Sequence, residues 1–354
     1  MASLTQIAVT TRKSFRWGLY GFISIILVRA ALLSTISVYK RLNPPPPPPP
    51  TVGFNLLPTI NFPEVTSELP PLEYKIETPT GTFPEFPETM PVYLMPKASI
   101  SISSADSAIT KAQAFGFGSI PLKLSDTLYK FLHPTIPSSM EINIVTETFS
   151  TSYNLAADPT PIKTTLPTPD VATSKAKSFL SKGNSLPEDV EDGTVTHEFL
   201  KVEGQNLVSA ISLSEADLIK VNLFREPINL GDEKNPLNYL SLPPNPDTAN
   251  IWAIVSGSQD VIASQYHYYP IEKSKIETYP IKTAQQAYDD LIAGKGYISN
   301  LGLNRDGKVT IREITLAYFD PNIQSQFYQP IFVFRGDRDF WAYVPAVTSE
   351  YYEE

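Results

Sequence analysis

The sequence predicts an α+β fold in which an N-terminal single transmembrane helix and a proline-rich stalk precede repeated modules of helix plus antiparallel sheet. Three observations lead to this prediction. Residues 17–39 form one long apolar run with a single charge, and seven consecutive prolines follow at residues 44–50. Beyond residue 98, three short helical patterns each end near a glycine and are followed by strand-like sequence. Such an order is typical of helices that cover one face of a sheet.

The bulk composition narrows the classes of protein to consider. A chain of 354 residues holds two or three domains as a prior, and a hydrophobic content of 42% is enough for a folded core. The absence of cysteine excludes disulfides, thiolate metal sites and cysteine nucleophiles. Residues 1–43 carry six Lys and Arg and no acid, whereas the remainder carries 22 basic and 37 acidic residues. An acidic body argues against a nucleic-acid partner.

The apolar run has the length of a membrane span. As a helix, residues 17–39 reach about 34 Å, and a bilayer core is about 30 Å thick. The run is too long for a cleaved signal peptide, and the prolines are a poor cleavage context. We therefore expect an uncleaved anchor in the cell membrane. Three basic residues before the run and two after it favour a cytoplasmic N-terminus, with residues 43–354 outside.

Arg29 lies in the middle of this span, where a charge costs about 2.5 to 3.5 kcal/mol on insertion. One interpretation is that it snorkels or lies in a local water defect, and the other is that it pairs with a polar group on a neighbouring transmembrane helix. Two small-xxx-small pairs, Ala30 with Ser34 and Ala31 with Thr35, allow close approach of helices. These five residues are the predicted partner-binding site. The partner would be a membrane protein or a second copy of the chain.

The domain organisation is expected to follow from these features. The expected parts are a cytoplasmic tail (1–16), a transmembrane helix (17–39), a stalk and extended segment (40–97), and three α+β modules (98–160, 161–235 and 236–354). Seven residues of polyproline II reach about 22 Å, so the prolines would act as a stiff spacer. A ligand for an SH3-like domain is the alternative. Residues 51–97 are expected to dock along the folded part, with an edge strand or two, through Phe54, Leu56, Leu57, Phe62 and Tyr74.

The helix predictions rest on their end signals. The first pattern runs from Ser104, a candidate N-cap, towards Gly116 or Gly118. In the second, Thr168 precedes Pro169 at the first helical position, and Gly183 ends the pattern. In the third, Thr283 and Gln286 form a predicted capping box, and Gly294 ends the helix.

Two local features are predicted within the last strands. Val309 and Ile311 share one phase of the alternation, whereas Ile314, Leu316 and Tyr318 share the other, so a bulge is expected at residues 312–313. The segment "RGDRD" (335–339) predicts a hairpin turn.

Sites with recognisable chemistry are few in the sequence. "GLNRDGKVTIRE" imitates a calcium loop through Asn304, Asp306 and Glu313, but its first position is Gly302, so an Asp-Gly turn is the better interpretation. The acidic run "PEDVEDG" (187–193) is expected to be a solvated loop or a weak divalent-cation site. None of the three histidines has a metal-ligand partner at the usual spacing. No catalytic or nucleotide-binding motif is present, and no cofactor is expected.

The C-terminal stretch "TYPIKTAQQAYDDLIAGKGYI…VTIREITLAYFDP…FYQPIFVFRGDRDFWAYVPAV" resembles the last module of the YycH/YycI-type regulators over about 75 of 354 residues. Those are bacterial, single-pass, extracytoplasmic proteins with PepSY-like modules. The resemblance implies a non-enzymatic role, in which the anchored protein binds and modulates or scaffolds a membrane or envelope protein. The alternative is a wall-associated carbohydrate-binding or hydrolytic protein. Aromatic residues crowded between 266 and 343 would supply exposed rings for it.

Overall fold

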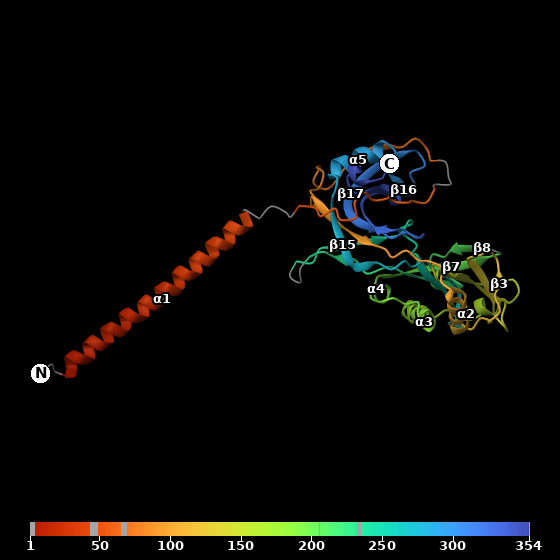
Figure 1. Cartoon of the computed structure of the whole chain (residues 1–354), viewed down its shortest axis with the longest axis horizontal. Helices are drawn as coiled ribbons and strands as arrows, with labels where there is room; N and C mark the ends of the chain where they lie inside the picture. The colour runs from red at the N-terminus through yellow and green to blue at the C-terminus, as the bar shows by residue number, and fades with distance from the viewer. Residues whose placement is uncertain are drawn as a thin grey trace. The chain divides into compact units, whose positions relative to one another are not determined.

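The computed structural model of the chain describes residues 4–42, 49–64, 69–204, 206–231, 235–258 and 260–353. Two compact units are present, Met1–Pro49 and Pro50–Glu354. The first unit contains one helix, α1 (Leu4–Leu42). The second is a mixed α+β unit with many strands and few helices (Figure 1). The predicted α+β class is therefore confirmed. Residues 44–48 of the predicted proline stalk lie outside the described residues.

The largest sheet of the second unit is antiparallel throughout and has the strand order β3-β4-β5-β6-β14-β13-β9-β7-β8. Its strands are β3 (Leu122–Lys123), β4 (Leu128–Leu132), β5 (Ser138–Asn143), β6 (Phe149–Tyr153), β7 (Val195–Glu203), β8 (Asn206–Ser209), β9 (Leu218–Leu223), β13 (Ile251–Ser256) and β14 (Val261–Tyr266). The β13–β14 hairpin lies in the middle of the sheet, because β14 pairs with β6 and β13 pairs with β9.

A second sheet has the order β1-β17-β19-β20-β16, with β12 also paired to β17. Its strands are β1 (Glu73–Ile76), β12 (Ser241–Leu242), β16 (Tyr297–Asn300), β17 (Lys308–Phe319), β19 (Pro330–Gly336) and β20 (Phe340–Pro345). Two smaller sheets join β15 (Glu272–Pro280), β2 (Thr89–Leu94) and β18 (Phe327–Tyr328), and β10 (Ile228–Asn229) with β11 (Asn238–Tyr239).

Helices cover one face of each large sheet. The longer helices of the second unit are α2 (Ser104–Ala114), α3 (Pro169–Lys182) and α5 (Ala284–Ile292). Short helical turns are α4 (Glu188–Glu191), η1 (Thr160–Ile162), η2 (Asp337–Asp339) and η3 (Ser349–Tyr351). α2 and α3 pack on the nine-stranded sheet around a core that includes Phe131, Phe149 and Leu180. α5 packs on the second sheet through Ala287 and Leu291.

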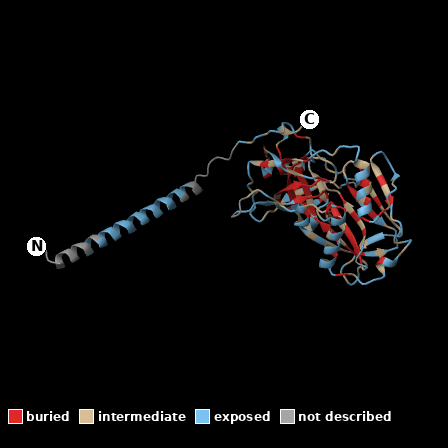
Figure 2. Cartoon of the chain, turned by 60° about the horizontal axis from the view of Figure 1, so that its bottom comes forward, coloured by how far each residue is buried: buried red, intermediate tan, exposed pale blue. Residues whose placement is uncertain are grey.

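The buried residues of the second unit lie within and between its sheets (Figure 2). The sequence of β19 contains a continuous apolar run, "PIFVF", without the usual alternation of apolar and polar residues. Phe332 and Phe334 face the core beneath α5, whereas Ile331 and Val333 face a second cluster with Phe62 and Tyr343. A strand that is covered on both faces has no polar side to alternate with.

The sheet order differs from the predicted succession of three modules. Strands from residues 98–160, 161–235 and 236–354 all contribute to the nine-stranded sheet, since β3–β6, β7–β9 and β13–β14 lie side by side in it. Alternation in the sequence shows which face of a strand is buried, but it does not show which strand is the neighbour. The structure therefore offers no support for independent repeated modules.

The extended segment after the prolines docks on the second unit, as expected. β1 is the edge strand of the second sheet and pairs in parallel with β17. β2 is the middle strand of the three-stranded sheet. Leu57 is fully buried, and the ring of Phe62 stacks on Tyr297 at 5.1 Å between centroids. Leu56 departs from the expectation, because it is exposed.

Local signals in the sequence placed several element ends correctly. α3 begins at Pro169 after Thr168 and is followed by Gly183, as predicted. α2 begins one residue away from the expected position, because its N-cap is Ser103. In β17 the register shifts between Ile311 and Glu313, which confirms the predicted bulge. The "RGDRD" segment connects the antiparallel strands β19 and β20 through η2.

Candidate functional site

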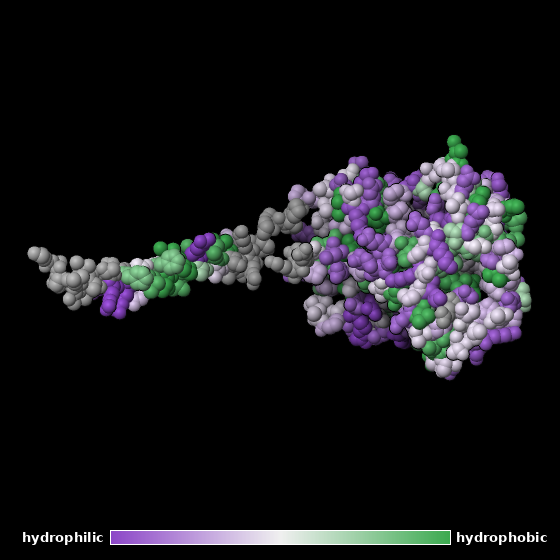
Figure 3. Space-filling model, turned by 90° about the horizontal axis from the view of Figure 1, so that it is seen from below, coloured by the Kyte–Doolittle hydropathy of each residue, from purple (hydrophilic) through white to green (hydrophobic). Residues whose placement is uncertain are grey.

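The first candidate site is the apolar part of α1. Residues Phe15–Ile36 form a 22-residue span with a mean hydropathy of 2.0, and none of it is buried inside the protein. Figure 3 shows this stretch as a green band of apolar side chains. A helix of this length and composition suits a single-pass membrane anchor. The observed span begins two residues before and ends three residues before the predicted one.

The five predicted partner-binding residues lie within this span, but on different sides of α1. At about 100° per residue, Ala30 and Ser34 lie roughly 100° and 140° around the helix from Arg29. Ala31 and Thr35 lie roughly 160° and 120° from it in the other direction. The Thr35 hydroxyl donates to the Ala31 carbonyl oxygen at 2.8 Å, so its polar group is satisfied within the helix. The small residues therefore lie mainly on the side of α1 away from Arg29.

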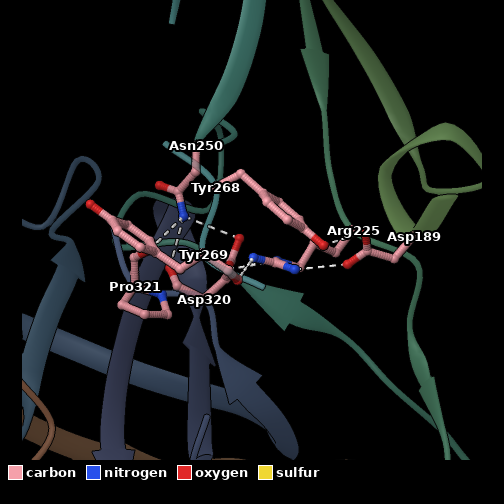
Figure 4. A network of polar contacts seen from close by, with 7 residues as sticks. All are labelled: Asp189, Arg225, Asn250, Tyr268, Tyr269, Asp320 and Pro321. Carbon is pink, nitrogen blue, oxygen red and sulfur yellow. Dashed lines mark hydrogen bonds and ion pairs between the residues drawn. The ribbon is translucent and has the colours of Figure 1, made fainter. Parts of the chain in front are cut away.

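The second candidate site is a buried polar network around Arg225, which the sequence did not single out (Figure 4). Arg225 follows β9 of the nine-stranded sheet, and Asp320 follows β17 of the second sheet. The guanidinium Nε donates to Asp320 Oδ1 at 2.8 Å, and Nη1 donates to Asp189 Oδ2 at 2.7 Å. Its Nη2 donates to the carbonyl oxygen of Tyr269 at 2.6 Å. The network therefore connects the two large sheets.

Surrounding groups complete this network. Asn250 Nδ2 donates to the backbone oxygen of Asp320 at 2.9 Å and to its Oδ2 at 3.1 Å. The hydroxyl of Tyr268 donates to Asp189 Oδ1 at 3.0 Å, and its ring lies 4.1 Å from the guanidinium carbon of Arg225. Every charged group thus has partners from at least two chain segments, as buried charges require.

Burial and charge act in opposite directions on the titration of this network. Burial alone would lower the pKa of Arg225, but Asp320, Asp189 and neighbouring groups more than offset it and raise that pKa. Burial raises the pKa of Asp320, and both the charge of Arg225 and the hydrogen bond from Asn250 oppose this rise. Arg225 and Asp320 are both buried, and the contacts of the network fit a structural connection between the sheets.

The third candidate site is a pocket at the other end of the nine-stranded sheet, with a volume of about 500 Å³. We call it the α3 pocket. It lies where β6 ends and β14 begins, and α3 forms one wall. Its lining includes the rings of Phe115, Phe117 and Phe179, the charged residues Asp158, Lys175, Lys182 and Asp260, and the hydroxyl residues Ser138, Thr151, Tyr153, Thr160, Ser178 and Ser258.

The α3 pocket contains a polarised Tyr–Asp pair. The hydroxyl of Tyr153 donates to Asp158 Oδ2 at 2.6 Å, and the backbone N–H of Thr160 donates to Oδ1 at 3.0 Å. Hydrogen bonds from Thr160 and Tyr153 lower the pKa of Asp158 to about 2. Burial and the adjacent Asp158 raise the pKa of Tyr153 to about 12. At neutral pH the pair is therefore a carboxylate beside a neutral phenol.

In the described part of the chain, neither the acidic run nor the calcium-like motif brings together three His, Asp or Glu side chains that could hold a metal ion. Asp189 of the acidic run is not fully solvated, because it belongs to the Arg225 network. Gly307 has a φ of +76°, which fits the Asp-Gly turn at residues 306–307. His197 Nε2 lies 2.8 Å from the hydroxyl of Thr173, and His267 is partly buried.

The aromatic residues between 266 and 343 are largely packed inside the second unit. Tyr328, Phe340 and Tyr343 are fully buried. The partly exposed ring of Trp341 lies 4.5 Å from the guanidinium carbon of Arg335, and that of Tyr268 faces Arg225. These residues therefore do not form an exposed platform of rings.

Neither a family model nor a curated protein matches the chain. Among solved structures, it is similar to an uncharacterized protein from Eubacterium rectale ATCC 33656, with 11% sequence identity and a TM-score of 0.34. That alignment covers 75% of this chain and 86% of the other. A likeness of this size indicates nothing about activity.

Proposed function

We propose that the protein is a non-enzymatic, membrane-anchored binding protein that modulates or scaffolds another membrane or envelope protein. The observation that carries this proposal is α1, whose span Phe15–Ile36 is wholly exposed and has Arg29 near its centre. An ionisable residue inside a membrane span is costly, and such residues commonly pair with a group on another helix. The resemblance of residues 278–347 to extracytoplasmic regulators supports the same proposal.

In this proposal residues 4–16 face the cytoplasm and residues 50–354 lie outside it. Three basic residues lie before residue 17 and two follow residue 39, which favours this orientation. The acidic composition of the second unit fits a protein partner better than a nucleic acid. The two faces of α1 offer two separate contacts. The face with Arg29 binds the partner protein, and the face with the small residues packs against a second copy of the chain.

The test is a crosslinked pull-down of the full chain from native membranes. Arg29→Leu removes the charge, Ser34→Leu blocks the small face, and Ile36→Leu is a matched control within the same helix. We expect a membrane protein that co-purifies with the unaltered chain and with the control. If the partner is lost only in Arg29→Leu or only in Ser34→Leu, the contact lies on the face of α1 that carries the altered residue.

A version in which residues 17–39 are replaced by a generic leucine-rich span completes the design. A partner that is retained in this version contacts residues 50–354 instead of α1. Absence of a partner in every version contradicts the proposal. Sedimentation of the purified chain with cell wall would then favour the alternative, a wall-associated carbohydrate-binding protein.

A further inference from the structure

The α3 pocket has the dimensions of a small-molecule site. Its volume of about 500 Å³ lies within the range of roughly 300 to 1,000 Å³ that is usual for ligand pockets. Phe115 and Phe117 are buried in its floor, and Phe179 of α3 packs on Phe115 at 4.7 Å between ring centroids. The rings give the pocket an apolar interior that a ligand side chain could occupy.

One wall of this pocket carries two lysines without ion-pair partners in the described part of the chain. Lys175 and Lys182 are seven residues apart, so they lie on the same side of α3 about two turns from one another. Some lysines of the second unit pair with carboxylates, as Lys111 does with Glu147 and Lys130 with Glu141. The charges of Lys175 and Lys182 are not neutralised in this way, so this wall of the pocket attracts an anion.

Another wall carries two carboxylates. Asp158 is held by Tyr153 and Thr160, and Asp260 accepts a hydrogen bond from the Ser258 hydroxyl at 3.0 Å. Neither carboxylate forms an ion pair with Lys175 or Lys182 within the described chain, although all four residues line one pocket. Opposite charges therefore share the pocket without neutralising each other by direct contact.

We propose that the α3 pocket binds a short peptide segment in which an apolar side chain lies between a carboxylate and an ammonium group. The phenyl rings receive the apolar side chain, the lysines of α3 receive the carboxylate, and the two aspartates receive the ammonium group. The Ser178 hydroxyl on α3 can both donate and accept, which matches the N–H and C=O groups of a peptide. The inference concerns the second unit and does not depend on the partner of α1.

The test is calorimetric titration of the full chain in nanodiscs with three blocked tripeptides. The probe is acetyl-Lys-Phe-Glu-amide. Acetyl-Ala-Phe-Ala-amide lacks the charges, and acetyl-Lys-Ala-Glu-amide lacks the ring. We expect saturable binding of the probe, and affinity at least tenfold lower for each of the other two. Equal affinity for all three, or no saturable binding of the probe, would overturn the proposal.

Two variants locate the binding. The double substitution Lys175→Glu and Lys182→Glu reverses the charge of the α3 wall, and it is expected to lower the affinity for the probe at least tenfold. Lys273→Glu makes the same change at an exposed lysine outside the pocket and should leave the affinity unaltered. All three lysines are exposed, so the fold should tolerate these changes. Unaltered affinity in the double variant would refute binding at this site.

Discussion

At the scale of single residues, Arg225 combines two ion pairs with a backbone hydrogen bond in the interior of the second unit. Its side chain is 3% exposed, and its ion pairs reach Asp189 and Asp320 at 2.7 and 2.8 Å. Exposed pairs such as Arg335 with Glu313 contribute little, because water screens them. The removal of one partner from a buried pair, in contrast, leaves an uncompensated charge in the interior.

We predict that Asp320→Ala lowers the free energy of unfolding by about 3 to 5 kcal/mol. The matched change Glu313→Ala, at a pair that is half exposed on both sides, should lower it by about 0 to 1 kcal/mol. Urea denaturation of both variants measures the difference. Similar small losses in the two variants would show that the network does not hold the sheets together.

A second prediction concerns the pH dependence of stability through Asp290 of α5. Burial alone would raise the pKa of Asp290, but hydrogen bonds and charge from Lys282 and Lys295 more than offset this and lower it. A carboxylate with a lowered pKa stabilises the folded state above its ordinary pKa, and this contribution is lost as the pH falls through the lowered value.

Asp290→Asn should therefore reduce the free energy of unfolding at pH 7, and the difference from the unaltered chain should shrink below about pH 4. Urea titrations at pH 7, 5 and 3 test this. A difference that stays constant across these values would mean that the ion pairs do not account for the effect of the substitution.

At the scale of elements, the ends of helices were the best predicted features. The capping box of α5 exists as expected: Gln286 N–H donates to Thr283 Oγ1 at 3.2 Å, and Thr283 N–H donates to Gln286 Oε1 at 2.8 Å. The bulge in β17 could also be predicted from the sequence, because a bulge is the simplest cause of a phase slip in the alternation of apolar and polar residues along a strand. Such features depend on neighbours in the sequence.

The two N-caps give a prediction with an internal control. Thr283 caps α5 with its side chain, whereas Thr168 precedes α3 without a side-chain hydrogen bond. Thr283→Ala should lower the free energy of unfolding by about 1 kcal/mol, and Thr168→Ala should change it much less. Thermal or urea denaturation measures both. A larger loss at Thr168 would contradict the role assigned to the capping box.

At the scale of the whole molecule, the sequence predicted the class of fold and a long apolar N-terminal helix, but not the order of the strands. The nine-stranded sheet brings residues 122–153 beside 251–266, and no local signal specifies that pairing. The Arg225 network was missed for the same reason, since Asp189, Arg225 and Asp320 meet only after the sheets form. The available signal was a charged residue close behind each apolar strand: Asp320 follows β17 directly, and Arg225 is the second residue after β9.

The proposed function requires that α1 spans a membrane and that the second unit lies outside the cytoplasm. The chain lacks cysteine, so single cysteines can be labelled without background. Ser3→Cys marks the N-terminal side of α1, and Ser274→Cys marks an exposed position on β15.

The most direct test is labelling of intact cells with a membrane-impermeant maleimide. With the proposed orientation, we expect the cysteine at position 274 to be labelled in intact cells and the cysteine at position 3 to be labelled only after the membrane is permeabilised. Labelling of position 3 with protection of position 274 would reverse the orientation. Protection of both positions in intact cells would contradict an anchored protein with its folded unit outside.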